Sequence, residues 1–364
     1  MNDLVIKQTR EYVSRILFML SLDLEQLLSE QILSRTKPVF AVVDGAAEWF
    51  FDRHFGAWAN VKKMVVQNTG EEIKIRATRD QIVDFLLESR AERSTTLLAV
   101  GGGLILDTAG LAASECKRGI PWVAIPTTLL AHVDASIGGK TAVNHPLAKN
   151  AIGQFYPPTN VVITPEVSET WSLTHRLEGR AEQYKIFSLF DFGAIERILA
   201  NPDDSSLVQR SIELKAQVVR VDPWERGLRG SLNYGHTFGH AFEHITHMPH
   251  GLAVALGVRN ENRVAEQIDI MSPHTRAKID RDLDDLGFTI PKTLPPFDQL
   301  LPYILQDKKV ADGKVRLAMI DGVNELSMSE FDPTRAVAIE IMETAYKQFC
   351  DDTRIVTESK SSQT

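Results

Sequence analysis

The chain has 364 residues, of which 43% are hydrophobic, enough apolar side chain to form one large or two medium folded domains. Its 40 basic and 48 acidic residues give a formal charge of −8 without a sustained basic block, so we expect no nucleic-acid partner. The apolar run Ile16–Leu20 is far too short to span a bilayer, so we expect no membrane segment and no signal peptide. Cys116 and Cys350 lie far apart and outside any metal-type spacing, which argues against a disulfide framework and fits a cytoplasmic location.

Short apolar runs alternate with helix-like stretches in the first half of the chain. The runs are rich in Val, Ile or Leu and are bounded by Gly, Pro or Asp, which predicts buried strands at 38–44, 96–103, 121–128 and 160–164. Between them lies 78–92, where apolar residues recur every three or four positions as in a helix. Alternating strands and helices predict a parallel sheet with crossover helices.

Helical patterns dominate the second half of the chain. The predicted helices are 177–200, 205–221, 234–248, 251–269, 273–286 and 334–350. We therefore predict an N-terminal α/β domain over residues 1–172 and a mostly α-helical domain over residues 173–364.

A glycine-rich turn follows the predicted strand 96–103. In AVGGGLILDTAG (99–110), three glycines end the strand and a helix begins. Such a turn lets a phosphate approach the backbone at a helix N-terminus, but tight strand-to-helix turns also use glycine for steric reasons alone. Asp107 is either a charge that favours the helix N-terminus or a hydrogen-bond partner for a nucleotide sugar or nicotinamide.

The segment 132–150 is polar and contains a Gly-Gly pair, so we expect a long loop. Many such loops are only solvated, but this one follows the predicted strand 121–128 and should emerge at the carboxyl edge of the sheet, where α/β folds bind ligands. Its lysines, Lys140 and Lys149, suit a phosphorylated, hydroxyl-rich substrate.

Four histidines share one face of the predicted helix 234–248, at 236, 240, 244 and 247. Two imidazoles at i and i+4 can chelate one divalent ion, and a third ligand from elsewhere would leave an open catalytic position. The metalloprotease pattern needs a glutamate directly after the first histidine, where this chain has Thr237, so protease chemistry is disfavoured. We interpret His244 and His247 as ordinary surface or packing residues.

Several motifs occur in a characteristic order between Asp44 and Gly313: GGGLILDTAG, RGIPWVAIPTTLLAHVDASIGGKTAVNHPLAKNAIGQFYPP, EGRAEQYK, and GLRGSLNYGHTFGH followed by HGLAVALG. Together they resemble the sugar-phosphate cyclase family, and most closely its 3-dehydroquinate synthase members. The resemblance implies a two-domain, dehydroquinate synthase-like enzyme, usually a homodimer. Its N-terminal Rossmann-like domain would hold NAD, and its helical domain would hold a divalent metal, Zn²⁺ or Co²⁺.

The resemblance also implies roles for individual residues. Metal ligands would be Glu182, His236 and His250, a familiar catalytic zinc set, while His240 would face the substrate without binding metal. Further substrate-side positions are Asp134, Lys140, Asn150, Lys185, Lys215, Arg229 and Asn233. Arg118 matches an arginine that reaches the phosphate from the neighbouring subunit, and either Lys308 or Lys309 matches a further lysine site.

NAD-contacting positions are implied in the same way at Asp44, Glu71, Lys74, Gly102, Gly103, Asp107, Thr127, Thr128 and Lys149. An acidic residue after a strand suits ribose hydroxyls and repels a 2′-phosphate, so Asp44 favours NAD over NADP.

The reaction implied is the conversion of 3-deoxy-arabino-heptulosonate 7-phosphate, a small phosphorylated sugar acid, to 3-dehydroquinate and phosphate in the shikimate pathway of aromatic amino acid biosynthesis. In this reaction NAD takes a hydride from a ring hydroxyl, phosphate is eliminated, the hydride returns, and an aldol step closes the carbocycle. Such an enzyme is a phosphate-eliminating carbon–oxygen lyase.

Some positions depart from the common synthase pattern. Leu252 replaces an acidic residue, Ala46 stands where an asparagine is frequent, and KIF at 185–187 replaces KYG. The change at Leu252 could alter the groups that orient His250.

Other functions therefore stay open. One is a cyclase of secondary metabolism acting on the amino analogue, on sedoheptulose 7-phosphate or on glucose 6-phosphate to give 2-deoxy-scyllo-inosose. The motif GGKTAVN, with Lys215 and Arg229 to bind a carboxylate, favours the dehydroquinate branch. The others are a glycerol dehydrogenase-like, metal-dependent alcohol dehydrogenase and a non-catalytic paralogue.

Overall fold

The computed structural model describes residues 11–67, 70–307, 310–311, 314–329, 333–354 and 356–357. Two compact units are present: the first runs up to Thr127 and resumes at Gly139–Val167, and the second comprises Thr128–Gly138 and the chain from Ser168 onward. The boundary expected after residue 172 differs from these units at 128–138 and at 168–172, which both belong to the second unit. As a domain boundary it stays a prediction.

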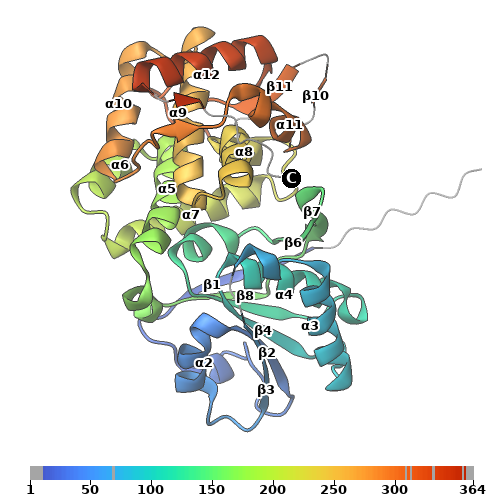
Figure 1. Cartoon of the computed structure of the whole chain (residues 1–364). Coiled ribbons are helices and arrows are strands. Elements are labelled where there is room, and N and C mark those ends of the chain that lie inside the picture. The colour runs from blue at the N-terminus through green and yellow to red at the C-terminus, as the bar shows by residue number, and fades with distance from the viewer. Residues whose placement is uncertain are drawn as a thin grey trace, which may run out of the picture. The chain divides into compact units, whose positions relative to one another are not determined.

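The first unit is built on a six-stranded sheet (Figure 1). Its strands, in spatial order, are β1 (Arg15–Phe18), β8 (Asn160–Ile163), β5 (Trp122–Pro126), β4 (Thr96–Gly101), β2 (Val39–Asp44) and β3 (Val61–Val66). Every neighbouring pair is parallel. Strands β2 and β8 are buried at every residue, as expected for a parallel sheet covered on both faces.

Helices cover both faces of this sheet. Helix α2 (Glu48–Phe55) lies on one side, and α3 (Arg76–Glu88) and α4 (Gly103–Glu115) lie on the other (Figure 1). The short helix α1 (Leu24–Ser29) follows β1. The four predicted strands and the predicted helix near 78–92 are therefore confirmed.

The polar segment 132–150 is not the long loop that we expected. It contains a π-helical turn, η4 (Ala131–Ala135), in the second unit, and then the antiparallel hairpin β6 (Lys140–His145) and β7 (Ala148–Phe155) in the first. The two strands pair with each other, which satisfies their backbone polar groups without burial in the core. A hairpin can therefore form from a polar sequence, and only Thr141 and Val143 of β6 are buried.

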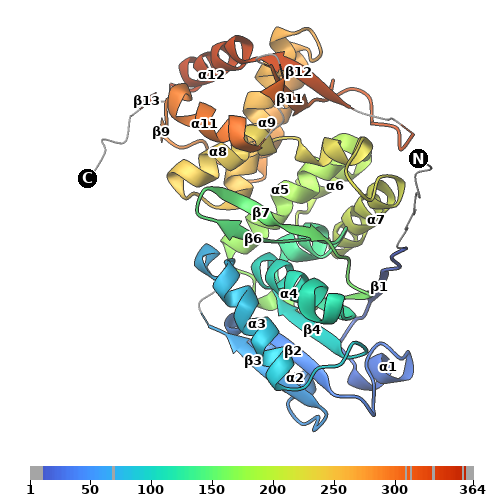
Figure 2. The ribbon, with the colours of Figure 1, turned by 90° about the vertical axis from the view of Figure 1, so that its right-hand side faces the viewer.

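The second unit is mostly helical (Figure 2). Its helices are α5 (Leu173–Phe190), α6 (Phe192–Ala200), α7 (Ser205–Val221), α8 (His236–Thr246), α9 (His250–Gln267), α10 (Pro273–Asp285), α11 (Phe297–Asp307) and α12 (Ile339–Thr353). Aromatic side chains such as Phe238, Phe242 and Tyr346 pack together in its core. No helix within the described ranges has the length and apolar character needed to cross a lipid bilayer.

Two predicted helices differ from those observed. The stretch 177–200 forms two helices, because the carboxylate of Asp191 caps α6 by accepting from the Ala194 N–H at 3.0 Å. The start of 334–350 is strand β12 (Thr334–Ala338), which pairs with β11 (Lys314–Ala318), itself paired with β10 (Val310–Ala311). A further pair joins β9 (Thr293–Leu294) to β13 (Val356–Thr357).

Candidate active site

Three potential metal ligands converge in the second unit. Glu182 lies on α5, His236 is the first residue of α8, and His250 is the first residue of α9. One ligand atom from each lies within 4.8 Å of the other two, and the Nε2 atoms of both histidines lie 3.3 Å from Glu182 Oε1. The carboxylate is buried and both rings are largely buried. One carboxylate and two imidazoles form a donor set that suits a divalent transition metal.

A buried carboxylate fixes the start of α8. Gly235, at φ +80°, precedes the helix and offers no side chain to cap it. Glu261 of α9 accepts hydrogen bonds from the N–H of Gly235 at 2.8 Å and of Thr237 at 3.1 Å. These contacts use backbone donors that a helix N-terminus leaves without an intrahelical partner. The backbone position of His236 therefore depends on Glu261.

The start of α9 is held by another acid. Helix α9 begins after Pro249, whose side chain makes no capping hydrogen bond. The carboxylate of Glu178 on α5 accepts the backbone N–H of His250. Burial raises the pKa of Glu178, against the lowering effect of His250.

Each ligand ring is oriented by an acceptor at Nδ1. His236 Nδ1 lies 3.1 Å from the carbonyl oxygen of Tyr234, and His250 Nδ1 lies 3.2 Å from Glu243 Oε2. A metal ion at this site would bind the neutral rings through Nε2, with the Nδ1–H of each ring donated to these acceptors. Both rings are thus oriented as metal ligands require.

The electrostatic surroundings of the two histidines differ. Burial and the nearby Lys185 ammonium lower the pKa of His236 to about 4. Burial also opposes charge on His250, but Glu182 and Glu243 outweigh it and raise the pKa of His250 to about 10. For Glu182, burial acts in the opposite direction and raises the pKa. Lys185, which forms an ion pair with Glu182, and His236 outweigh this effect and bring the pKa of Glu182 well below its ordinary value. This ionised, cation-surrounded carboxylate fits the proposed ligand set.

Several predicted substrate-side residues gather in the same unit. Lys215 of α7 donates to the backbone oxygen of Asp134 at 2.7 Å and contacts its carboxylate. Burial lowers the pKa of Lys215 to about 8, although Asp134 raises it. Burial raises the pKa of Asp134, but Lys215 outweighs this and the pKa lies below its ordinary value. Lys215 thus carries its charge at neutral pH.

The turn η6 (Leu228–Asn233) holds two more of these residues. The Arg229 guanidinium donates to the carbonyl oxygen of Pro223 at 2.8 Å and to that of Gly138 at 3.0 Å. Asn233 Nδ2 donates to Glu225 Oε1 at 2.9 Å. The ring centroid of His240 lies 5.1 Å from that of His236, and His240 is not part of the three-ligand group.

Four of the predicted NAD residues of the first unit lie at or just after the carboxyl ends of its strands: Asp44, Gly102, Gly103 and Thr127. Asp44 ends β2 and accepts from the Ala46 N–H at 2.9 Å. A Cβ added to Gly101 would lie 2.9 Å from the Cβ of Asp44, and the Thr127 N–H donates to the Gly101 oxygen at 3.0 Å. Gly102 is the N-cap of α4 and Gly103 its first residue, with no side-chain cap. The backbone N–H groups at the start of α4 are donors of the kind that bind a pyrophosphate.

Two ion pairs complete this set. Lys74 Nζ lies 2.6 Å from Asp107 Oδ2, and Lys149 Nζ lies 3.7 Å from Glu71 Oε1. The amide of Asn144 donates to the same Glu71 oxygen at 2.5 Å. Thr128, the remaining predicted NAD contact, belongs to the second unit.

Other predicted residues are placed on hairpins and turns. Lys140 begins β6, and Asn150 lies on β7 at φ +53° with its N–H donated to Asn144 Oδ1 at 2.9 Å. Arg118, at φ +64°, ends the turn η3 (Cys116–Arg118) with its side chain exposed. Lys308 and Lys309 lie outside the described residues.

The sequence analysis missed Glu243, Glu261 and Glu178, which hold the metal-binding group in place. Glu243 could have been found, because it follows His236 by seven residues and so lies on the same face of the helix. Glu261 carried no such signal, because it stands among polar residues in the stretch RNENR (259–263). Residues such as these are recognised by their contacts more than by local pattern.

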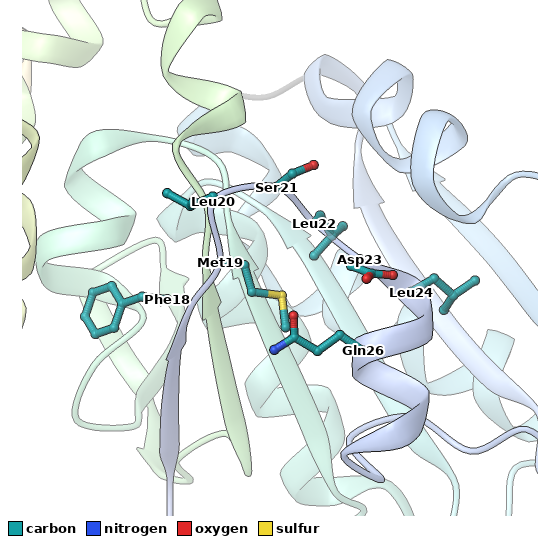
Figure 3. Close-up of a pocket in the computed structure, with 8 residues that line it drawn as sticks. All are labelled: Phe18, Met19, Leu20, Ser21, Leu22, Asp23, Leu24 and Gln26. Carbon is teal, nitrogen blue, oxygen red and sulfur yellow. The ribbon is translucent and has the colours of Figure 1, made fainter.

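A hollow of about 550 Å³ opens in the first unit at the turn between β1 and α1 (Figure 3). Its lining residues are Phe18, Met19, Leu20, Ser21, Leu22, Asp23, Leu24 and Gln26. None of them is a predicted site residue, and we assign the hollow no part in catalysis.

Comparison with known proteins identifies the family. Residues 64–177 match the family described as 3-dehydroquinate synthase N-terminal, and residues 179–310 match 3-dehydroquinate synthase C-terminal. The chain belongs to the 3-dehydroquinate synthase family. The predicted family and enzyme class, a phosphate-eliminating cyclase, are thereby confirmed.

Individual relatives agree with this result. The chain is 40% identical over 277 residues to the 3-dehydroquinate synthase of Rippkaea orientalis, covering 72% of this chain and 75% of the relative. It is 38% identical over 311 residues to that of Geotalea uraniireducens, covering 80% and 84%.

A solved structure confirms the predicted fold class. It is the 2-epi-5-epi-valiolone synthase ValA of Streptomyces hygroscopicus subsp. jinggangensis, determined with NAD⁺ and Zn²⁺ bound. The TM-score is 0.83 at 21% identity, and the match covers 96% of this chain and all of the other, 100%. At this identity the likeness concerns the fold alone.

Proposed function

We propose that this protein is a 3-dehydroquinate synthase, which converts 3-deoxy-arabino-heptulosonate 7-phosphate to 3-dehydroquinate and phosphate with NAD and a divalent metal. The observation that carries the proposal is the convergence of Glu182, His236 and His250. The 38–40% identity to curated 3-dehydroquinate synthases supports this substrate over those of other cyclases.

The donor chemistry supports a zinc ion, with cobalt as a substitute, held by Glu182, His236 and His250. A bound divalent ion would supply Lewis acidity, which lowers the pKa of a substrate hydroxyl. The turn at Gly102 and Gly103 and the acid at Asp44 support NAD as the dinucleotide. A bound NAD would supply reversible hydride transfer within one turnover.

Basic residues bind the two anionic ends of the substrate in this proposal. Lys215 and Arg229 grip the carboxylate, since a buried ammonium and a forked guanidinium both bind such a group strongly. Their hydrogen bonds to backbone carbonyls support this role, because they hold both cations in fixed positions. The other substrate contacts that we propose are Asp134, Lys140, Asn150, Lys185 and Asn233.

His240 carries a proton or contacts the phosphate in this proposal. Its ring lies beside that of the ligand His236, which supports a place next to the reacting oxygens. The eliminated phosphate can itself accept the proton in the elimination step, so no separate protein base is required.

We further propose a homodimer in which Arg118 reaches the phosphate in the neighbouring subunit. The exposed side chain of Arg118 and its position at a turn in left-handed conformation support this role. A cytoplasmic location and a place in the shikimate pathway are part of the same proposal, with a domain boundary near residue 172.

Phosphate release tests the substrate. Purified protein with NAD and zinc is given the heptulosonate phosphate, its amino analogue, sedoheptulose 7-phosphate and glucose 6-phosphate in separate reactions. We expect phosphate from the first at the highest kcat/KM, without accumulation of NADH. Preference for another sugar would assign the chain to a secondary-metabolism cyclase, and NADH accumulating with glycerol would assign it to the alcohol dehydrogenases. Stoichiometric binding of metal and NAD, with no phosphate from any of the four sugars and no NADH from glycerol, would make it a non-catalytic paralogue.

A further inference from the structure

Glu243 makes a contact with a ligand histidine that the proposed function does not use. Its carboxylate Oε2 lies 3.2 Å from His250 Nδ1, and its side chain is 18% exposed. Glu243 and His236 lie seven residues apart on α8, two helical turns, so they share one face. Helix α8 thus provides one of the three ligands and also contacts the ring of a second.

Leu252 cannot take this role. A leucine side chain offers His250 no hydrogen-bond acceptor. Leu252 instead lines a cavity of about 110 Å³, together with Leu177, Glu178 and Phe288 among others. Glu178, the acid in that cavity, accepts the backbone N–H of His250 and so holds the main chain at the start of α9.

The two ligand rings are therefore held by different kinds of acceptor. The acceptor for His236 is a backbone carbonyl, which no substitution removes. The acceptor for His250 is a side-chain carboxylate, and a carboxylate behind a ligand histidine fixes the ring orientation and raises the basicity of the imidazole as a ligand. Within the described part of the chain, the group of converging ligand atoms includes Glu182, His236 and His250 and leaves out Glu243.

We infer that Glu243 is the positioning residue for His250: its carboxylate holds the Nδ1–H and directs Nε2 toward a divalent cation shared with Glu182 and His236. This inference rests on the metal-binding part of the proposed function. It makes metal affinity depend on a carboxylate that α8 provides.

The test measures zinc binding in place of turnover. Glu243→Ala and Glu243→Gln are compared with the unchanged protein by competition with a chromophoric zinc chelator, and Co²⁺-loaded samples are compared by visible absorption. Loss of a carboxylate behind a ligand histidine weakens metal binding about 10- to 100-fold, and we expect this for Glu243→Ala with an altered Co²⁺ spectrum. Glu243→Gln keeps an acceptor for Nδ1–H and loses only the charge, so we expect a smaller loss of several fold.

The control is Glu340→Gln on α12, which removes one exposed negative charge from the same unit. We expect it to leave both readouts unchanged. Zinc affinity and Co²⁺ spectra of both Glu243 variants equal to those of the control would overturn the inference. If Glu243→Ala does not fold, as judged by circular dichroism without metal, the isosteric Glu243→Gln decides alone.

The same experiment separates this inference from the proposed function. If the unchanged protein binds no zinc, the metal-dependent function fails and the inference fails with it. If it binds zinc but releases no phosphate from any of the four sugars, only the catalytic proposal fails. If it binds zinc and releases phosphate while the Glu243 variants bind zinc normally, only the positioning role fails.

Discussion

Replacing Gly257 by alanine should both destabilise the second unit and weaken metal binding. Gly257 of α9 faces the turn before α8, and a Cβ there would lie 1.7 Å from the Gly235 oxygen and 2.8 Å from the Gly239 nitrogen. These are backbone atoms, so no side-chain rotation relieves the contact. The two helices must separate by roughly 1.3 Å to reach the 3.0 Å at which real contacts begin.

The expected magnitude follows from two opposing effects. Overpacking of this kind costs about 1–3 kcal/mol, and a contact against rigid backbone belongs at the upper end. Alanine recovers up to about 1 kcal/mol of helix propensity, so we expect a net loss of about 2 kcal/mol in the free energy of unfolding. Because His236 follows Gly235 directly, a shift of this size also moves a ligand, and a metal site tolerates only about 0.5 Å. We expect zinc affinity to fall tenfold or more.

Urea unfolding of the metal-free protein measures the first effect, and chelator competition measures the second. Gly193→Ala in α6 is the matched control, since the nearest atom to its added Cβ is Asp191 Oδ1 at 3.5 Å. That variant should keep its zinc affinity and be unchanged in stability or gain up to about 1 kcal/mol. A Gly257→Ala protein with the urea midpoint and zinc affinity of the Gly193→Ala protein would refute the idea that this close approach sets the start of α8.

Three further predictions concern charge, metal and cofactor. Since burial lowers the pKa of Lys215 to about 8 and Asp134 opposes this, kcat/KM should fall as pH rises through about 8. The fall should begin at lower pH in Asp134→Asn, and an unchanged profile would contradict the role of Lys215. Removing zinc with a chelator should lower the free energy of unfolding by about 2.7 kcal/mol, relative to protein in free zinc at 100 times the Kd. Urea unfolding measures this difference. Equal midpoints would argue against a zinc site in the folded state. Asp44→Ala should weaken NAD binding about 10- to 100-fold, because hydrogen bonds to a charged group are worth about 1.5–3 kcal/mol. The same variant should discriminate less against NADP. Fluorescence titration with both dinucleotides checks this, and unchanged affinities would remove Asp44 from the cofactor site.

The sequence predicted the central strands and most helices because each one has a clear pattern of burial. Strand β2 is buried throughout and appears as a continuous apolar run. The edge strand β3 was missed, because its exposed Lys62 and Lys63 interrupt the run, as is common at a sheet edge. Strand β12 was taken for the start of a helix, since its pairing partner β11 lies sixteen or more residues earlier and no local pattern reveals it.

Local sequence pattern alone does not predict the metal ligands. Helical spacing alone favours His236 and His240 as a chelating pair, because they lie one turn apart. In the structure the ligand atoms that converge with His236 come from Glu182 on α5 and His250 on α9. Only the resemblance to a family indicated those two residues, since the contacts that unite them are tertiary.

Both ligand histidines begin a helix, and in both cases a carboxylate from another helix holds the first turn. Glu261 of α9 holds the start of α8, and Glu178 of α5 holds the start of α9. Helix α5 also provides the third ligand, Glu182, one turn after Glu178. The three helices therefore contact one another both through the ligand atoms and through the acids at the helix starts, so an ion at this site is coupled to their packing. A substitution that shifts any one of these three helix contacts should weaken metal binding, even where the substituted residue contacts no ligand.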